Sequence, residues 1–335
     1  MPARRLIFLL LVLCVASALF SLSWRAPVSL FDLWNPGTDA GSLQKRDAAC
    51  RIFLILRPTR MVAAILVGAS LSLAGAGLQT LFRNPLAEPY LLGISSGGAL
   101  GATLAIALRL PLLFGLDAAV PLAWAGSIGA GFTVFALGRG NGSGLDATSG
   151  RARLLLVGVA LSAFLSALLS LVVSLSGNAN LVQETAFWLL GGLNRANWTQ
   201  NAVLLVSLCL GFALLRGTAR DLDALAAGDE DALALGVNAR KLQARVLIAA
   251  GLLAASSVAV AGLIGFVGLL APHLVRLCGG RGAKTLLPGA ALGGAALLCG
   301  CDALARGAFA PIEVPVGIWT AILGVPLFLF LARRM

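Results

Sequence analysis

The chain has 335 residues, of which 59% are hydrophobic and 12% are charged, and its formal net charge at pH 7 is +11. Ordinary soluble domains carry about 25% charged residues, so this composition excludes a soluble globular protein and fits an all-α, polytopic membrane protein. The positive charge does not indicate nucleic-acid binding, because Lys and Arg occur in twos and threes between apolar runs, as in the loops that flank membrane spans.

The N-terminus resembles a secretory signal, with Arg4 and Arg5 before an apolar core. The run 6–23 is nearly long enough to cross a bilayer, so we interpret it as a retained first span. The second run, 58–82, is rich in small residues, which predicts a helix packed inside a bundle. A single transmembrane domain, 1–335, is expected, with ten spans: 6–23, 58–82, 92–110, 118–138, 154–176, 199–217, 242–262, 263–278, 285–305 and 315–332.

The eighth run, 263–278, is the weakest of these predictions. It has 16 residues and contains Pro272 and His273, whereas a membrane-spanning helix needs about 20 residues. We therefore expect a broken or half-depth helix whose irregular backbone is buried in protein. Its depth and its side of the membrane do not follow from the sequence.

The distribution of positive charge predicts the orientation. With a cytoplasmic N-terminus, most Lys and Arg fall on the inner side, so both termini are expected in the cytoplasm. Most of the exceptions lie in the first outer loop or at the start of the second span: Arg25, Lys45, Arg46, Arg51, Arg57 and Arg60.

A weak internal similarity suggests duplicated halves. An offset of 187 residues superposes four residues of the second span region on four of the seventh and eighth runs: Ser70, Ala74, Gly75 and Pro85 on Ser257, Ala261, Gly262 and Pro272. An odd number of spans between the copies would make this an inverted repeat, which is common among transporters.

The segment 218–241 is the longest cytoplasmic stretch with polar content. Within it, Asp229 begins a predicted short helix, where anions suit the helix dipole, and Gly236 ends it. Ala232, Leu233 and Leu235 would then present an apolar surface to the cytoplasm. Both an ordinary amphipathic loop and a docking site for a soluble partner would explain this pattern.

Two short motifs resemble catalytic signatures without meeting their requirements. Gly93–Gly97 matches the G-x-S-x-G pattern around Ser95, but that pattern needs a preceding strand and a histidine partner, and the chain has one histidine, His273. Gly279–Thr285 resembles a phosphate-binding loop, but Ala283 stands where glycine must precede the lysine. We expect Ser95 to cap a helix, His273 to be satisfied by backbone carbonyls, and ATP to bind elsewhere. The cysteines require neither a disulfide nor a metal site.

Several longer motifs resemble the permease subunits of bacterial type II ABC importers, the FecCD and BtuC-like family, which import iron-siderophore complexes, haem or cobalamin. They occur in the order and spacing of that family: R-P-T-R (57–60), L-F-R-N-P-L-A-E-P-Y-L-L-G-I-S-S-G (81–97), L-A-L-G-V-N (233–238), G-F-V-G-L-L-A-P-H-L-V-R-L (265–277), L-L-P-G-A-A-L-G-G (286–294) and E-V-P-V-G-I-W-T-A-I-L-G-V-P-L-F (313–328).

The resemblance implies a homodimer in the bacterial inner membrane, with two cytoplasmic ATPase subunits that bind ATP-Mg and a periplasmic substrate-binding protein. This chain itself would hold no cofactor or metal and would not be an enzyme. The resemblance assigns three sets of residues. The residues expected to dock the binding protein are Arg57, Arg60 and Arg306. Those expected to couple the chain to the ATPase are Gly228, Asp229, Glu230, Ala232, Leu235 and Gly236. Those expected to form the inner end of the pathway are Asn84 and Leu86.

Iron-siderophore complexes are expected as the first cargo and haem or cobalamin next, although no motif separates the three, and the Gly/Ser-rich loop 139–153 does not align with the family. Two other functions are compatible with parts of the sequence, a secondary transporter and a membrane enzyme. A secondary transporter driven by an ion gradient would need ionisable groups within the spans, for which His273 and the Asp302–Arg306 pair are the candidates. Since Asp302 and Arg306 lie four residues apart on a helix, an ion pair at its end is the simpler interpretation. A membrane enzyme would have to use Ser95 or His273.

Overall fold

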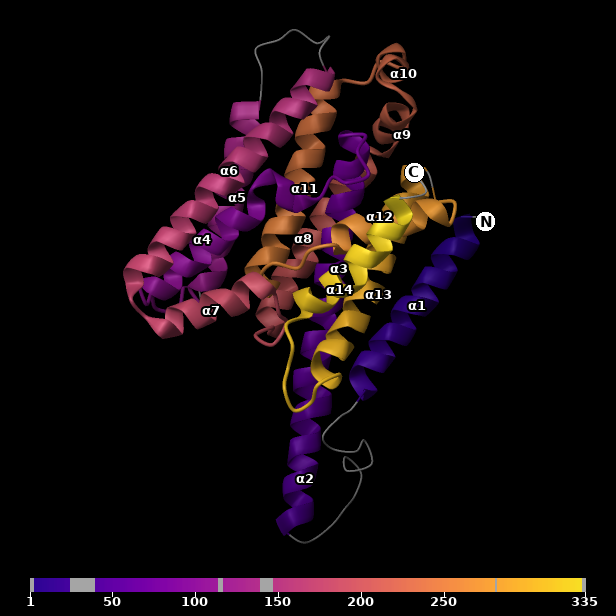
Figure 1. Ribbon diagram of the computed structural model, residues 1–335. Coiled ribbons are helices and arrows are strands. Elements are labelled where there is room, and N and C mark those ends of the chain that lie inside the picture. Colours follow the sequence, from indigo (N-terminus) through magenta and orange to yellow (C-terminus); the bar gives the residue numbers. More distant parts are fainter. Residues whose placement is uncertain (1–2, 25–39, 114–116, 139–146, 281, 333–335) are drawn as a thin grey trace.

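The computed structural model describes residues 3–24, 40–113, 117–138, 147–280 and 282–332, and its regular elements are helices, which confirms the all-α fold (Figure 1). Seven helices of this part are long and apolar enough to cross a membrane. The α-helices are α1 (Ala3–Ser23), α2 (Ala40–Cys50), α3 (Arg57–Leu81), α4 (Ile94–Ala107), α5 (Ala119–Gly138), α6 (Ala147–Ser176), α7 (Ala179–Leu190), α8 (Trp198–Gly217), α9 (Ala219–Ala227), α10 (Asp229–Ala234), α11 (Ala239–Ala261), α12 (Val267–Leu277), α13 (Ala283–Gly307) and α14 (Val316–Ala332).

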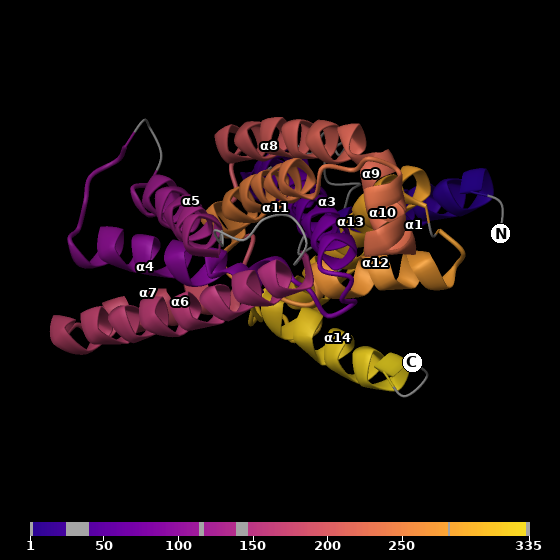
Figure 2. The same ribbon diagram turned by 90° about the horizontal axis from the view of Figure 1, so that it is seen from above.

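Helix α3 is the centre of the bundle, as its small residues predict. It packs against α8, α11, α12 and α13, and it lies between α8 on one side and α6 and α14 on the other (Figure 2). Nearly every residue from Ala63 to Leu81 is buried. By contrast, only 6% of the most apolar 18-residue stretch of α6 is buried within the chain. Helix α6 therefore presents an apolar surface to its surroundings.

Two glycines of α3 allow neighbouring backbones to approach closely. A Cβ atom on Gly68 would lie 2.3 Å from the carbonyl oxygen of Gly294 in α13, and one on Gly75 would lie 1.9 Å from the carbonyl oxygen of Gly268 in α12. Neither position has room for a side chain. Glycine at these crossings therefore brings α3, α12 and α13 within the close backbone contact that small residues allow in membrane bundles.

Three features differ from the elements expected from the apolar runs. The helix that contains the second run begins far earlier, because α2 continues through a π-helical turn, Arg51–Leu56, directly into α3. A short helix that was not predicted, α7, connects α6 to α8. The superposed prolines of the suggested repeat lie in different settings, since Pro85 follows the end of α3 whereas Pro272 lies inside α12. The inverted repeat stays a prediction.

The two ends of the bundle are distinguished by the helices that lie at each. Following the predicted orientation, we name the end where α3 ends and α9 and α10 lie the inner end, and the end where α3 begins the outer end. Helix α1 begins, and α14 ends, on the side of α9 and α10 (Figure 1). The loop 139–146 and the expected outer-loop charge Arg25 lie outside the described residues.

Candidate functional site

The chain is interrupted between α11 and α12, as the weak eighth run predicts. Helix α12 has 11 residues and follows a non-helical stretch from Gly262, in which Phe266 has a φ of +67°. The backbone groups of this stretch are bonded within the protein. The hydroxyl of Tyr90 accepts a hydrogen bond from the Ile264 N–H (2.9 Å) and donates one to its carbonyl (2.6 Å). The Glu88 carboxylate accepts one from the Phe266 N–H (2.8 Å). Irregular backbone at membrane depth requires such internal partners.

Helix α12 also depends on a side chain of α3 itself. Pro272 has no N–H, so the Gly268 carbonyl, four residues earlier, lacks its usual helical donor. The side-chain amide of Gln79 donates to this carbonyl (3.3 Å) and to that of Leu269 (3.1 Å). Arg276 in turn donates to the Gln79 Oε1 and to the Thr80 Oγ1. A buried polar side chain of α3 thus completes the hydrogen bonding of the proline-containing helix.

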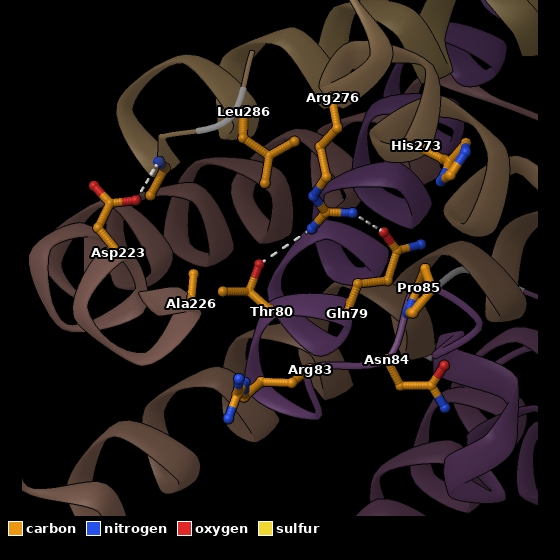
Figure 3. Close-up of a pocket in the computed structure, with 11 residues that line it drawn as sticks. Gln79, Thr80, Arg83, Asn84, Pro85, Asp223, Ala226, His273, Arg276 and Leu286 are labelled. Carbon is orange, nitrogen blue, oxygen red and sulfur yellow. Dashed lines mark hydrogen bonds between the residues drawn. The ribbon is translucent and has the colours of Figure 1, made fainter. Parts of the chain in front are cut away.

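A pocket of about 370 Å³ lies at the inner end, among the end of α3, α9, α12 and the start of α13 (Figure 3). It is lined by Gln79, Thr80, Arg83, Asn84, Pro85, Asp223, Ala226, His273, Arg276, Ala283 and Leu286. The Asp223 carboxylate accepts a hydrogen bond from the Ala283 N–H (2.6 Å), where an anion suits the first turn of α13. No hydrogen bond joins the His273 ring to a described residue, so its expected satisfaction by backbone carbonyls is not found.

The two predicted pathway residues lie beside this pocket. After α3 ends, the Asn84 Oδ1 accepts a hydrogen bond from the Leu86 N–H (2.9 Å), which forms a tight turn. Asn84 lines the pocket, and the Leu86 side chain is 45% exposed. The structure therefore places both residues at the inner end of α3, where the family resemblance expects the pathway to end.

The predicted coupling segment forms two short helices, α9 and α10, at the same end. Helix α10 begins at Asp229, and Gly236, with a φ of +73°, follows its end, as predicted. One prediction within it is wrong. Ala232 is buried, because it faces into the segment, whereas Leu233 and Leu235 are 54% and 73% exposed. The exposed apolar surface at this position therefore consists of Leu233 in α10 and Leu235, the residue that caps its end.

Asp229 binds two arginines from other parts of the chain. Both of its carboxylate oxygens accept hydrogen bonds from Arg151, at 2.6 and 3.0 Å, and Arg83 donates to one of them at 3.3 Å. The hydrogen bond from Arg151 and the charges of both arginines hold the pKa of Asp229 below its ordinary value. Glu230 and Asp231 on the same turn are exposed.

The three predicted docking arginines lie together at the outer end, and each has partners within the chain. Arg60 contacts Asp302 (2.7 Å) and Glu313 (2.7 Å). Arg306 contacts Asp302 from the other side (3.1 Å), so the predicted ion pair is confirmed, and it also binds Ser21. Arg57 donates to two backbone carbonyls at the end of α1, those of Leu22 and Trp24.

Asp302 is the residue at the outer end that sequence reasoning underestimated. Its side chain is fully buried, and those of Arg60 and Arg306 are each 13% exposed. The four-residue spacing from Asp302 predicted its pairing with Arg306. Nothing in the sequence predicted its pairing with Arg60, which lies 242 positions away. We name Asp302, Arg60, Arg306 and Glu313 the outer cluster, and Asp229, Arg83 and Arg151 the inner cluster.

The catalytic-looking serine has no partner that would activate it. Ser95 lies in the first turn of α4, buried, with no hydrogen-bond partner for its hydroxyl. It does not cap the helix as expected, since Gly93 is the N-cap residue and no side chain bonds there. A nucleophilic serine requires an adjacent base, so the structure gives no support to an enzyme built on Ser95.

Comparisons with known proteins agree over most of the chain. Residues 8–334 match the model of the FecCD transport family. The chain is 40% identical to the hemin transport system permease protein of Yersinia pestis, over 99% of this chain and 96% of that protein. It is 42% identical to the cobalamin import system permease protein of Halobacterium salinarum, over 83% of this chain and 72% of that protein. A solved metal-chelate type ABC transporter in an inward-facing conformation has a TM-score of 0.82 and 32% identity, over 99% of this chain and all of that one.

Proposed function

Since the chain belongs to the FecCD transport family, we propose that it is the membrane-spanning permease subunit of an ABC importer, which moves a bulky metal chelate from the periplasm to the cytoplasm. The observation that carries this proposal is the family match over residues 8–334. The seven long apolar helices support a multi-pass membrane location, which we assign to the bacterial inner membrane with both termini cytoplasmic.

Haem is the first cargo to test. The hemin permease relative matches this chain from end to end, whereas the cobalamin permease relative matches 83% of it. Iron-siderophore complexes, which the sequence alone would rank first, remain the third class to test. A bulky chelate suits a pathway with few strong binding groups, so the binding protein would supply most of the specificity.

In this proposal two copies of the chain form the pathway along their shared axis, and Asn84 and Leu86 border its inner end. Two ATPase subunits, which hold ATP-Mg, dock on α9 and α10 and drive alternating access. The exposed Leu233 and Leu235 support such an apolar contact. At the outer end, Arg57, Arg60 and Arg306 bind acidic groups of the periplasmic binding protein.

An ion-gradient transporter is the second candidate, and the structure gives it less support. It would need free ionisable groups within the spans. Asp302, one of its two candidate side chains, is held between Arg60 and Arg306. Because both of its oxygens are bound by arginines, a carboxylate in that position is poorly suited to bind and release protons.

Reconstitution into liposomes tests the proposal. The chain would be assembled with the ATPase subunit and binding protein encoded beside it, and uptake of haem, cobalamin and a ferric siderophore would be compared. We expect uptake of one of these chelates that requires ATP, the ATPase and the binding protein. Uptake that proceeds without the ATPase and follows an imposed proton gradient would contradict the proposal and favour the second candidate.

A further inference from the structure

The inner cluster joins three segments that are far apart in the sequence. Arg83 follows the end of α3, Arg151 lies near the start of α6, and Asp229 begins α10. Arg151 binds both oxygens of the carboxylate, in the two-pronged arrangement that fixes orientation as well as distance. Arg83 adds a third, longer contact on one of the same oxygens.

Each of these arginines belongs to a part of the chain at the inner end: Arg83 to the turn after α3, and Arg151 to the start of α6. Arg83 immediately precedes Asn84 and Leu86, the proposed inner border of the pathway. Arg151 belongs to the first turns of α6, directly after the loop that begins at residue 139. One carboxylate of α10 is thus in contact with two separate segments at the inner end, the turn after α3 and the start of α6.

Helix α10 has few other attachments to the bundle. It packs chiefly against α9, whereas α9 packs against α3, α8 and α13. The segment 229–235, which is α10 with its C-cap residue Leu235, has two kinds of surface. Asp229 points toward the bundle and is 28% exposed, whereas Leu233 and Leu235 are largely exposed. The leucines are free to contact a partner, and the carboxylate is already occupied.

We propose that Asp229 acts within the chain as a positioning residue, which transmits movement of α10 to the Asn84–Leu86 turn through Arg83 and to the start of α6 through Arg151. This inference rests on the proposed function, because the movement comes from the docked ATPase. It assigns docking to Leu233 and Leu235 and transmission to Asp229, although all three lie within seven residues.

The test is the ratio of chelate delivered to ATP hydrolysed in the reconstituted complex. Asp229→Asn keeps the size of the side chain and removes the charge. We expect ATPase subunits to copurify and to hydrolyse ATP as before, while the ratio falls about fivefold or more, the lower end of typical coupling between sites. Asp229→Glu, which keeps the carboxylate, should restore part of the ratio. Arg151→Gln should lower it similarly, and the double variant should fall no further, because both changes break one contact.

Asp231→Asn is the matched control. It removes the same charge from the same turn of α10, but Asp231 is exposed and forms no ion pair among the described residues. Its ratio should equal that of the unaltered complex. Equal unfolding temperatures for the two Asn variants would exclude misfolding as the cause.

Two results would overturn the inference. An unchanged ratio in Asp229→Asn would show that the contact transmits nothing, and loss of the ATPase subunits from that variant would show that Asp229 belongs to the docking surface. Failure of the proposed function would look different, since the unaltered complex itself would then show no ATP-dependent uptake.

Discussion

The inner and outer clusters use the same chemistry for different purposes. In each, one aspartate lies between two arginines; both arginines of the inner cluster come from distant segments, whereas in the outer cluster Arg60 is distant and Arg306 lies one turn away on α13. Asp302 is fully buried and joins α3 to α13, which already pack at the Gly68–Gly294 crossing. Asp229 is partly exposed and joins the small helix α10 to segments that do not otherwise hold it. We therefore expect the buried Asp302 to act as a fixed support between α3 and α13, and the partly exposed Asp229 to act as a contact that can shift with α10.

The largest effect is expected from Asp302→Asn. This change leaves Arg60 and Arg306 buried without the carboxylate between them, and breaking a buried pair in this way costs about 3–5 kcal/mol. Urea unfolding of the purified chain in detergent would measure it. Glu313→Gln is the control, since it removes an exposed partner of the same Arg60 and should cost less than about 1 kcal/mol. Equal effects of the two variants would show that burial of the carboxylate does not set the cost of breaking these ion pairs, and would remove the basis on which the two clusters are distinguished.

A smaller loss is expected from Gly294→Ala, which would separate α3 from α13. The added Cβ would lie 1.9 Å from the Ser72 Oγ and 2.3 Å from the Gly68 carbonyl oxygen. Overpacking of this kind costs about 1–3 kcal/mol, measured by the same unfolding experiment. Gly300→Ala on the same helix meets nothing within 4 Å and should be neutral or stabilising. If both variants unfold alike, close contact at this crossing does not support the outer cluster.

Loss of the inner cluster should change stability by less than about 1 kcal/mol, because its groups are partly exposed. The pKa of Asp229 is lowered in the folded chain, so its contribution is present above the unfolded pKa of about 4 and disappears as pH falls through the lower, folded value. The unaltered chain and Asp229→Asn should therefore differ at pH 7 and converge in strong acid. A difference that instead grew in acid would contradict the pairing, and added salt should reduce the difference at pH 7.

The smallest effect on stability is expected from Arg57→Glu. Arg57 binds two backbone carbonyls and no carboxylate among the described residues, so unfolding should change little. Its proposed effect is on docking, where a reversed charge should weaken affinity for the binding protein, most visibly at low salt. Titration of the binding protein onto the complex at two salt concentrations would measure this. Affinity that is unchanged at low salt would exclude Arg57 from the docking surface.

The parts of the fold that could be predicted are those with local signals. Small residues predicted the central place of α3, and the short length of the run 263–278 with its Pro272 predicted the interruption before α12. The continuous helix from α2 into α3 was missed because the charged residues around Lys45 to Arg51 break the apolar pattern without breaking the helix. The inner cluster and the Arg60–Asp302 pair join residues 78 to 242 positions apart, and a single sequence contains no signal for such contacts.

The dependence of α12 on α3 has a consequence for how the chain enters the membrane. Gln79, Glu88 and Tyr90 supply the hydrogen bonds that the interrupted backbone around Ile264 and Pro272 cannot make for itself. They are synthesised about 180 residues earlier, so they are already in place when α12 leaves the ribosome. Unsatisfied backbone groups are expensive in lipid, so α12 should reach its final depth only by sliding in alongside α3. We therefore expect insertion of α12 to require that α3 and the residues that follow it are already folded in the membrane.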